Sequence, residues 1–173
     1  LFKKMNETAS RIPIGSDGLM FFPFMAGTGT LSLQAKIKGS FIGVDLHHSQ
    51  AHFYRAVMES IAFELRELLV RLTSKEFQCK QIRSMGGGSK STLWNQIKCD
   101  VCGIPIVTLA SNETASLGIA ILSSCALKHS SSIEEAVETM VHINKVYEVN
   151  EKNHAAYNER FEQFIKLQSI LYL

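Results

Sequence analysis

Three consecutive glycines, Gly86, Gly87 and Gly88, stand between a strand predicted at 82–85 and a helix predicted at 91–101. Without a Cβ atom, the backbone of glycine can lie flat against a ligand and adopt positive φ at little steric cost. The free N–H groups and the positive dipole end of the helix point back at this turn. Such a turn is typical of a seat for the phosphates or base of a nucleotide, and it is equally compatible with a tight turn that binds nothing.

Two common phosphate-binding motifs do not fit the glycine run. A P-loop requires Gly-x-x-x-x-Gly-Lys-Ser/Thr, whereas Lys90 follows Ser89 rather than a glycine. A dinucleotide-binding fingerprint requires Gly-x-Gly-x-x-Gly, whereas the residue three positions after Gly88 is Ser91. The glycine run therefore belongs to a different class of turn.

The chain after residue 82 alternates between strands and helices, which favours an α/β fold with a parallel sheet and right-handed crossovers. A glycine inside a helix costs about 1 kcal/mol relative to alanine, so Gly118 predicts the close approach of another backbone. The elements predicted after the first helix are a strand at 104–109, helices at 114–125, 133–141 and 151–171, and an extended segment at 145–149.

The strongest periodic signal lies at 49–72, where apolar residues at helical spacing predict a long helix. Ser49 is a suitable N-cap, and Glu64 and Glu67 are predicted to face water. The apolar residues that carry the periodicity are Phe53, Val57, Ile61, Phe63, Leu65, Leu68, Leu69 and Leu72.

Histidines and cysteines offer two candidate metal sites, each with a simpler alternative. His48 and His52 are spaced i,i+4 at the start of the long helix, which can hold a metal but also suits a polar first helical turn. Cys99 and Cys102 have the spacing of a redox pair or half a zinc site. No second pair accompanies them, so we expect two small buried residues and assign no metal site.

Composition excludes several classes of protein. The formal net charge is only +2, and the Lys and Arg residues are scattered along the 173 residues rather than clustered. This pattern does not suggest nucleic-acid binding. No apolar run approaches the roughly 18 residues of a membrane span. Reduced cysteines fit a cytoplasmic protein, and the absence of an initial methionine leads us to expect a piece of a longer chain.

Three segments, in order and spacing, resemble the C-terminal half of the FGGY family of carbohydrate kinases. Residues 39–60 are similar to the second sequence signature of the family. Residues 86–91 are similar to its Gly-Gly-Gly/Ala-x-x-Ser/Asn element, and residues 113–120 to its Glu-x-x-Ala-Leu-Gly-Ala-Ala element. The resemblance extends from about residue 15 to the end of the chain.

The resemblance implies an actin-like, ribonuclease-H-like ATPase domain with a mixed sheet flanked by helices. Residues 1–173 would be the single C-terminal nucleotide-binding domain of a two-domain sugar kinase that uses ATP and Mg²⁺. In the family the N-terminal domain supplies the catalytic aspartate and most sugar contacts. Nothing in this sequence corresponds to that domain, so the resemblance assigns no catalytic residue here.

The resemblance also assigns roles to individual glycines. Gly86 and Gly87 would face the phosphates and ribose of the nucleotide, and Gly88 would keep the turn free of a Cβ atom. Ser91 matches a position near the adenine that is often asparagine in relatives. Gly27 matches a glycine near the nucleotide phosphates. The sequence from 27 to 31 departs from the Gly-Glu-Arg-Thr-Pro of many xylulose kinases, so the resemblance does not decide which sugar is the substrate.

The function implied is transfer of the γ-phosphoryl group of ATP to a sugar hydroxyl, with the pentulose xylulose as the first candidate substrate. The expected partners are the sugar, the N-terminal domain of the same parent chain and a second copy in a homodimer, with no nucleic acid and no membrane. Two alternatives remain: an actin-like ATPase outside sugar metabolism, and a non-catalytic interaction domain that keeps the glycine turn only as architecture.

Overall fold

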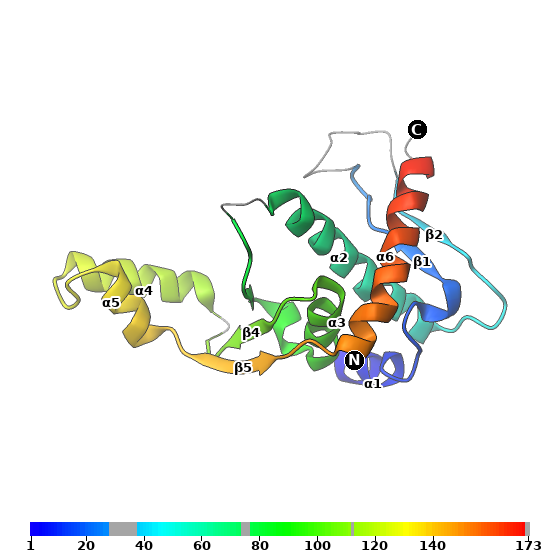
Figure 1. Cartoon of the computed structure of the whole chain (residues 1–173). Helices are drawn as coiled ribbons and strands as arrows, with labels where there is room; N and C mark the ends of the chain where they lie inside the picture. Colours follow the sequence, from blue (N-terminus) through cyan, green and yellow to red (C-terminus); the bar gives the residue numbers. More distant parts are fainter. Residues whose placement is uncertain (28–37, 74–76, 112, 172–173) are drawn as a thin grey trace.

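The computed structural model describes residues 1–27, 38–73, 77–111 and 113–171 (Figure 1). The predicted helices and strands are confirmed, with their ends shifted by a few residues at most. Their order is α1 (Phe2–Ala9), the 3-10 turn η1 (Ser16–Gly18), β1 (Met20–Phe22), β2 (Ser40–Ile42), α2 (Gln50–Leu72), β3 (Ile82–Ser84), the 3-10 turn η2 (Gly87–Lys90), α3 (Thr92–Cys102), β4 (Ile106–Leu109), α4 (Thr114–Ala126), α5 (Ile133–Met140), β5 (Ile143–Tyr147) and α6 (Glu151–Leu171).

The strands form two small sheets. β3 and β4 pair in parallel, with Ile82 opposite Ile106, as the strand–helix–strand order predicts. β5 pairs antiparallel with β4, with Tyr147 opposite Ile106, because α5 returns the chain to the sheet from the opposite direction. The three-stranded sheet is therefore mixed, and β1 and β2 form a separate antiparallel pair.

The main core lies where α2, α3 and α6 meet β1 (Figure 1). Phe22 of β1 stacks on Phe164 of α6 with ring centroids 4.9 Å apart, and Phe63 of α2 packs against the same ring. Full burial of each such side chain contributes about 1.5–3 kcal/mol. This packing positions α3, and therefore the turn before it, against α2.

Helix α2 is confirmed, but its buried face differs from the predicted apolar stripe. Ile61 and Leu72 are exposed, whereas Glu67 is only 7% exposed. Glu64 is half-buried, so the prediction that Glu64 and Glu67 face water is wrong. Glu67 Oε1 accepts a 2.6 Å hydrogen bond from Arg71, which compensates part of the cost of burying its charge.

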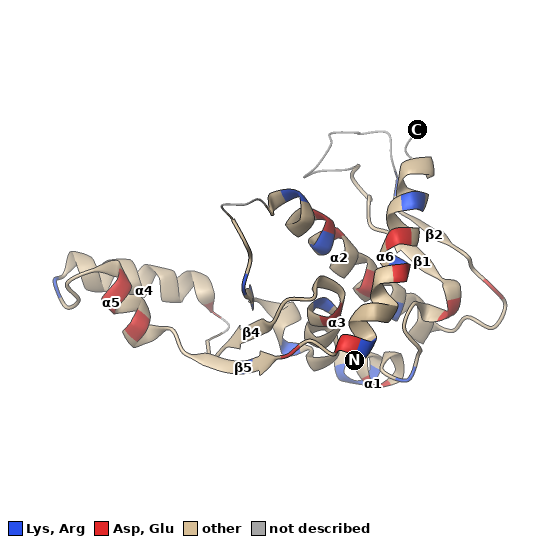
Figure 2. Cartoon of the chain, in the orientation of Figure 1, with Lys and Arg blue, Asp and Glu red and all other residues tan. Residues whose placement is uncertain are grey.

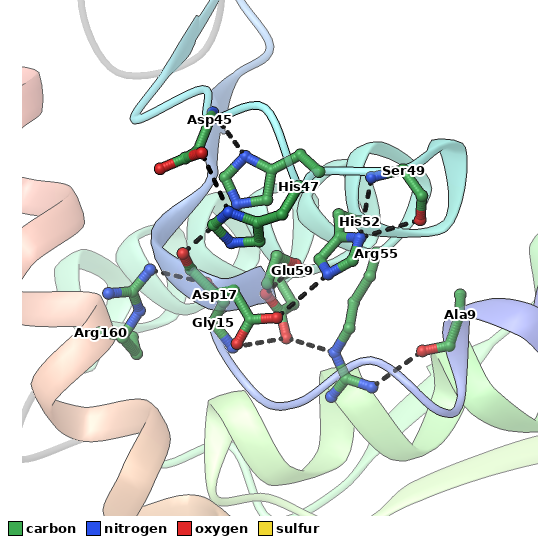
Figure 3. A network of polar contacts seen from close by, with 12 residues as sticks. Ala9, Gly15, Asp17, Asp45, His47, Ser49, His52, Arg55, Glu59 and Arg160 are labelled. Atoms are coloured by element: carbon green, nitrogen blue, oxygen red, sulfur yellow. Dashed lines mark hydrogen bonds and ion pairs between the residues drawn. The ribbon is translucent and has the colours of Figure 1, made fainter.

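A buried carboxylate on α2 joins three parts of the fold (Figure 3). Glu59 accepts hydrogen bonds from Arg55 Nε at 2.8 Å, from the Tyr157 hydroxyl at 3.0 Å and from Gly15 N at 3.1 Å. Arg55 also donates to the carbonyl of Ala9 at 3.2 Å. Glu59 therefore connects α2 to α6 and to the loop that follows α1.

The loop held by Glu59 contains strained backbone. Ser16 and Asp17 have φ of 49° and 51°, which non-glycine residues rarely adopt. Glu59 Oε2 accepts a 3.1 Å hydrogen bond from the Ser16 hydroxyl, and Arg160 of α6 donates to the carbonyl of Gly15 at 2.8 Å. Residues in such conformations persist only where their surroundings hold them.

Gly118 does not make the close backbone approach that its position in a helix predicts. A Cβ atom built at Gly118 would meet no atom of the described chain within 4 Å. Among the residues that the structure describes, no other backbone approaches Gly118, so the prediction is not met by any of them.

Replacing Glu59 by alanine should lower the free energy of unfolding by about 3–5 kcal/mol, because Arg55 would remain buried without its charge partner. Urea denaturation measures the change. Glu7→Ala on the exposed side of α1 is the control and should change stability by less than about 0.5 kcal/mol. Equal effects of the two substitutions would contradict the role of Glu59.

Burial, with the charge of Glu67 as the second cause, raises the pKa of Glu64 to about 7 from 4.5. Between these values the folded chain holds a proton that the unfolded chain has lost, so stability should fall as pH rises from about 5 to 8. Glu64→Gln should flatten this slope, measured as melting temperature against pH, whereas Glu138→Gln on α5 should leave it unchanged. A wild-type slope in Glu64→Gln would contradict the assignment.

Candidate functional site

The candidate site is the turn between β3 and α3. Gly86 adopts φ 73° and ψ −164°, a conformation that is open to glycine and costly for other residues. A single 3-10 turn follows, in which Ser89 N donates to the carbonyl of Gly86 and Ser91 N to the carbonyl of Gly88, both at 3.2 Å. The chain thus enters α3 through a tight backbone turn.

The three glycines have different surroundings. A Cβ atom built at Gly86 or Gly87 would meet no atom of the described chain within 4 Å. At Gly88 it would lie 2.6 Å from Cζ3 of the Trp94 ring. Gly88 is therefore glycine because the indole packs on it, whereas at Gly86 and Gly87 the protein leaves the adjoining space open.

Buried polar contacts fix the turn to its neighbours. The fully buried Asn95 of α3 donates to the carbonyl of Ser89 at 2.7 Å and accepts from the Ser84 hydroxyl at 2.9 Å. Trp94 Nε1 donates to the carbonyl of Met58 on α2 at 3.2 Å. The turn is consequently held by β3, α2 and α3 together.

The surroundings of the turn carry positive charge. Arg83, Lys90 and Lys98 are the charged residues between Gln81 and Cys99, and all three are basic. Lys98 donates to Ser84 Oγ at 2.8 Å and lies over the Trp94 ring, and burial lowers its pKa. With the positive end of the α3 dipole, these groups favour a polyanionic ligand.

Ser91 and Gly27 do not border the open space beside Gly86 and Gly87 in the same way: one caps a helix and the other lies in a different part of the fold. Ser91 Oγ accepts a 3.1 Å hydrogen bond from Trp94 N, so the hydroxyl caps α3. Gly27, with φ 86°, follows β1 of the other sheet. Among the described residues no hydrogen bond joins Gly27 to the glycine turn, and Gly29 and Thr30, which belong to the same predicted loop, lie outside those residues.

Asn95 and Lys98 also support the turn, although the sequence alone did not single them out. Both lie on the helix after the glycines, four and seven residues beyond Ser91, and therefore on one helix face. No local pattern in the sequence points to either residue, because both roles depend on contacts with Ser84 of the preceding strand.

The cysteine pair packs in the structure. Cys99 is fully buried and its Sγ donates to the carbonyl of Tyr147 at 3.2 Å. Burial raises the pKa of Cys99 to about 11 and that of Cys102 to about 12, so both thiols stay protonated at neutral pH. Over the described residues, no group of three or more metal-binding side chains is found.

The histidines at the start of α2 bind protein groups (Figure 3). His52 Nδ1 accepts from Ser49 N at 3.1 Å and completes a capping box, while its Nε2 lies 3.0 Å from Asp17 Oδ2. His48 Nδ1 accepts from Asp45 N at 2.9 Å. These contacts correspond to the polar first turn that was the alternative to a metal site.

A pocket of about 410 Å³ lies away from the glycine turn, between the loop after α1 and helices α3 and α6. Asp100 on its wall already accepts from Gln96, Asn150 N and Asn153, at 2.8, 2.9 and 2.9 Å. These bonds join α3 to the start of α6. Asp100 on the wall of this pocket is therefore satisfied by protein groups.

Comparisons with known proteins agree with this geometry. The xylulose kinase of Staphylococcus epidermidis is 34% identical over 163 residues, which cover 94% of this chain and 33% of that protein. The structure of ligand-bound xylulose kinase from Lactobacillus acidophilus superposes with a TM-score of 0.87 and 27% identity, over 98% of this chain and 34% of that one. Gluconate kinase from the same organism gives a TM-score of 0.82 and 26% identity, with the same coverage.

This chain spans about a third of the length of the relatives it matches. No helix in the described ranges is both long and apolar enough to cross a membrane. The superpositions establish the actin-like, ribonuclease-H-like ATPase fold. The model of the FGGY family of carbohydrate kinases, C-terminal domain, matches residues 2–127, and the chain therefore belongs to the FGGY family.

Proposed function

We propose that residues 1–173 form the C-terminal nucleotide-binding domain of an ATP-dependent sugar kinase, and that the turn at Gly86–Gly88 seats the nucleotide. The observation that carries the proposal is the open space beside Gly86 and Gly87 at the start of α3. Family membership supports it, because the family consists of carbohydrate kinases.

Phosphoryl transfer from ATP with Mg²⁺ depends on positioning and on neutralisation of charge. In this chain the backbone of Gly86 and Gly87 would lie against the phosphates and ribose, with Arg83 and Lys90 exposed nearby to offset negative charge. The Asn95 and Trp94 contacts would hold the turn in one geometry before the ligand arrives, which lowers the cost of binding. Gly27 and Ser91 are proposed as further contacts, and the hydroxyl of Ser91 is already used as a helix cap.

The acceptor sugar and the catalytic base would come from the longer protein. A general base must lie within hydrogen-bond reach of the attacking hydroxyl, and we place it in the N-terminal domain of the parent chain. Xylulose is the first candidate substrate because several relatives of this chain are xylulose kinases. Gluconate is the second candidate because a gluconate kinase shares the fold. The four free cysteines and the use of ATP suit a cytoplasmic enzyme.

The two earlier alternatives receive less support. An actin-like ATPase outside sugar metabolism has no particular observation in its favour once the chain belongs to a carbohydrate kinase family. A non-catalytic interaction domain would have no use for the open space beside Gly86 and Gly87, since a tight turn needs only the positive φ of Gly86.

Gly87→Val, made in the longer kinase, should weaken ATP binding at least tenfold, or about 1.4 kcal/mol, because the branched side chain would fill the space proposed for the ligand. The fold should survive, since that space is empty of protein atoms. Isothermal titration calorimetry with ATP and Mg²⁺ measures the dissociation constant.

Thr139→Val on α5 is the matched control and should leave the dissociation constant unchanged. Gly87→Ala should give a smaller loss than Gly87→Val, because the added volume is smaller. A folded Gly87→Val protein that binds ATP like the wild type would remove the assignment of the site.

A further inference from the structure

The pocket between the loop after α1 and helices α3 and α6 has the size and lining of a small-molecule site. Its volume of about 410 Å³ falls in the range of about 300–1,000 Å³ that ligand pockets have. The apolar side chains that line it are Ile12, Pro13, Ile14, Leu93 and Ile97. Because apolar walls with a few polar groups are typical of ligand pockets, the polar groups of this one indicate what it binds.

The pocket lies on the opposite side of α3 from strand β3. Asn95 and Lys98 point toward β3, where both bond to the Ser84 hydroxyl. Leu93 and Ile97 lie on the other side of the helix and line the pocket. The pocket is therefore distinct from the space beside the glycine turn, which follows β3.

The buried guanidinium of Arg55 lines the pocket and has hydrogen-bond donors to spare. Arg55 is 6% exposed, and Figure 3 shows its guanidinium between Glu59 and Ala9. Its Nε donates to Glu59, one terminal nitrogen donates to the Ala9 carbonyl, and the other donates to the Tyr157 hydroxyl at 3.0 Å. An arginine has five N–H groups, and within the described part of the chain the remaining ones have no acceptor. Because a buried donor without an acceptor is costly, these N–H groups need an acceptor inside the pocket.

A second guanidinium lies at the rim of the pocket. Arg11 belongs to the loop after α1, which Figure 2 shows as a basic segment, and its side chain is exposed. It makes no hydrogen bond or ion pair to another residue that the structure describes. Arg11 is therefore available to an anion that enters the pocket.

We propose that this pocket binds a small monocarboxylate with an apolar body. The carboxylate accepts hydrogen bonds from Arg55 at the floor and from Arg11 at the rim, since the planar guanidinium matches the geometry of a carboxylate. The apolar body lies against Ile12 and Leu93. This binding site is independent of the nucleotide site proposed above.

The acidic residues near the pocket favour a single negative charge on the ligand. Asp100 lies on the wall and is 2% exposed, and Glu59 lies behind the guanidinium of Arg55. Both carboxylates already accept hydrogen bonds from protein groups, so they do not need the ligand as a partner. Their charge still repels an anion, and it repels a phosphate dianion about twice as strongly as a carboxylate.

Three probes with the same hexyl body test the proposal by isothermal titration calorimetry of the longer protein at neutral pH. Hexanoate should bind at one site. The uncharged 1-hexanol and the more highly charged hexyl phosphate should each bind at least about tenfold more weakly. Hexanoate should still bind when ATP and Mg²⁺ are present, because the pocket and the glycine turn lie on different sides of α3.

Substitutions locate the binding in the pocket. Arg11→Gln should weaken hexanoate binding at least about fivefold, because one charged donor is lost. Lys152→Gln is the matched control, since Lys152 is exposed on α6 and does not line the pocket, and it should leave the affinity unchanged. Ile12→Trp should fill the space of the ligand body and abolish binding. Circular dichroism of each variant verifies that it is folded.

Several results would overturn the proposal. No binding of hexanoate would show that the pocket holds only water, and equal binding of hexanoate and 1-hexanol would remove the role of the two guanidinium groups. Tighter binding of hexyl phosphate would assign the pocket to phosphate esters instead. Equal effects of Arg11→Gln and Lys152→Gln, or displacement of hexanoate by ATP, would place the probe outside this pocket.

Discussion

The buried carboxylate of Glu59 is the interaction on which the arrangement of the domain depends. It is 2% exposed and bonds to the loop after α1, to Arg55 of its own helix and to Tyr157 of α6. Asn153 of α6, and Asn150 N just before that helix, in turn hold α3 through hydrogen bonds to Asp100. The glycine turn lies at the other end of α3, so its orientation follows from a chain of contacts that begins at Glu59.

A buried ion pair stabilises little by itself, because desolvation offsets most of its attraction. Its value here is that the carboxylate also accepts from Gly15 N and the Ser16 hydroxyl, which hold a loop with unfavourable backbone angles. The loop leads directly into β1, whose Phe22 packs in the main core. One charged side chain thereby determines how the start of the chain joins the helical bundle.

Local patterns predicted the elements well, and long-range contacts explain where those patterns failed. The periodicity at 49–72 identified α2, but counting only apolar residues placed Glu64 and Glu67 on the wrong side of it. The partners of Glu59 lie 44 and 98 residues away, at Gly15 and Tyr157, and no local pattern points to them. Three consecutive glycines are visible in the sequence, so the turn could be predicted. The packing of the Trp94 ring on Gly88 is a tertiary contact, and only the structure shows it.

The central claim, that the turn before α3 seats ATP, is tested most directly by hydrogen–deuterium exchange of the longer kinase with and without ATP and Mg²⁺. Exchange in peptides spanning 82–94 should slow on addition of nucleotide, because backbone N–H groups of the turn would be covered by the ligand. Peptides from α5, remote from the turn, serve as the internal reference. Protection elsewhere in the protein, with unchanged exchange at 82–94, would contradict the claim.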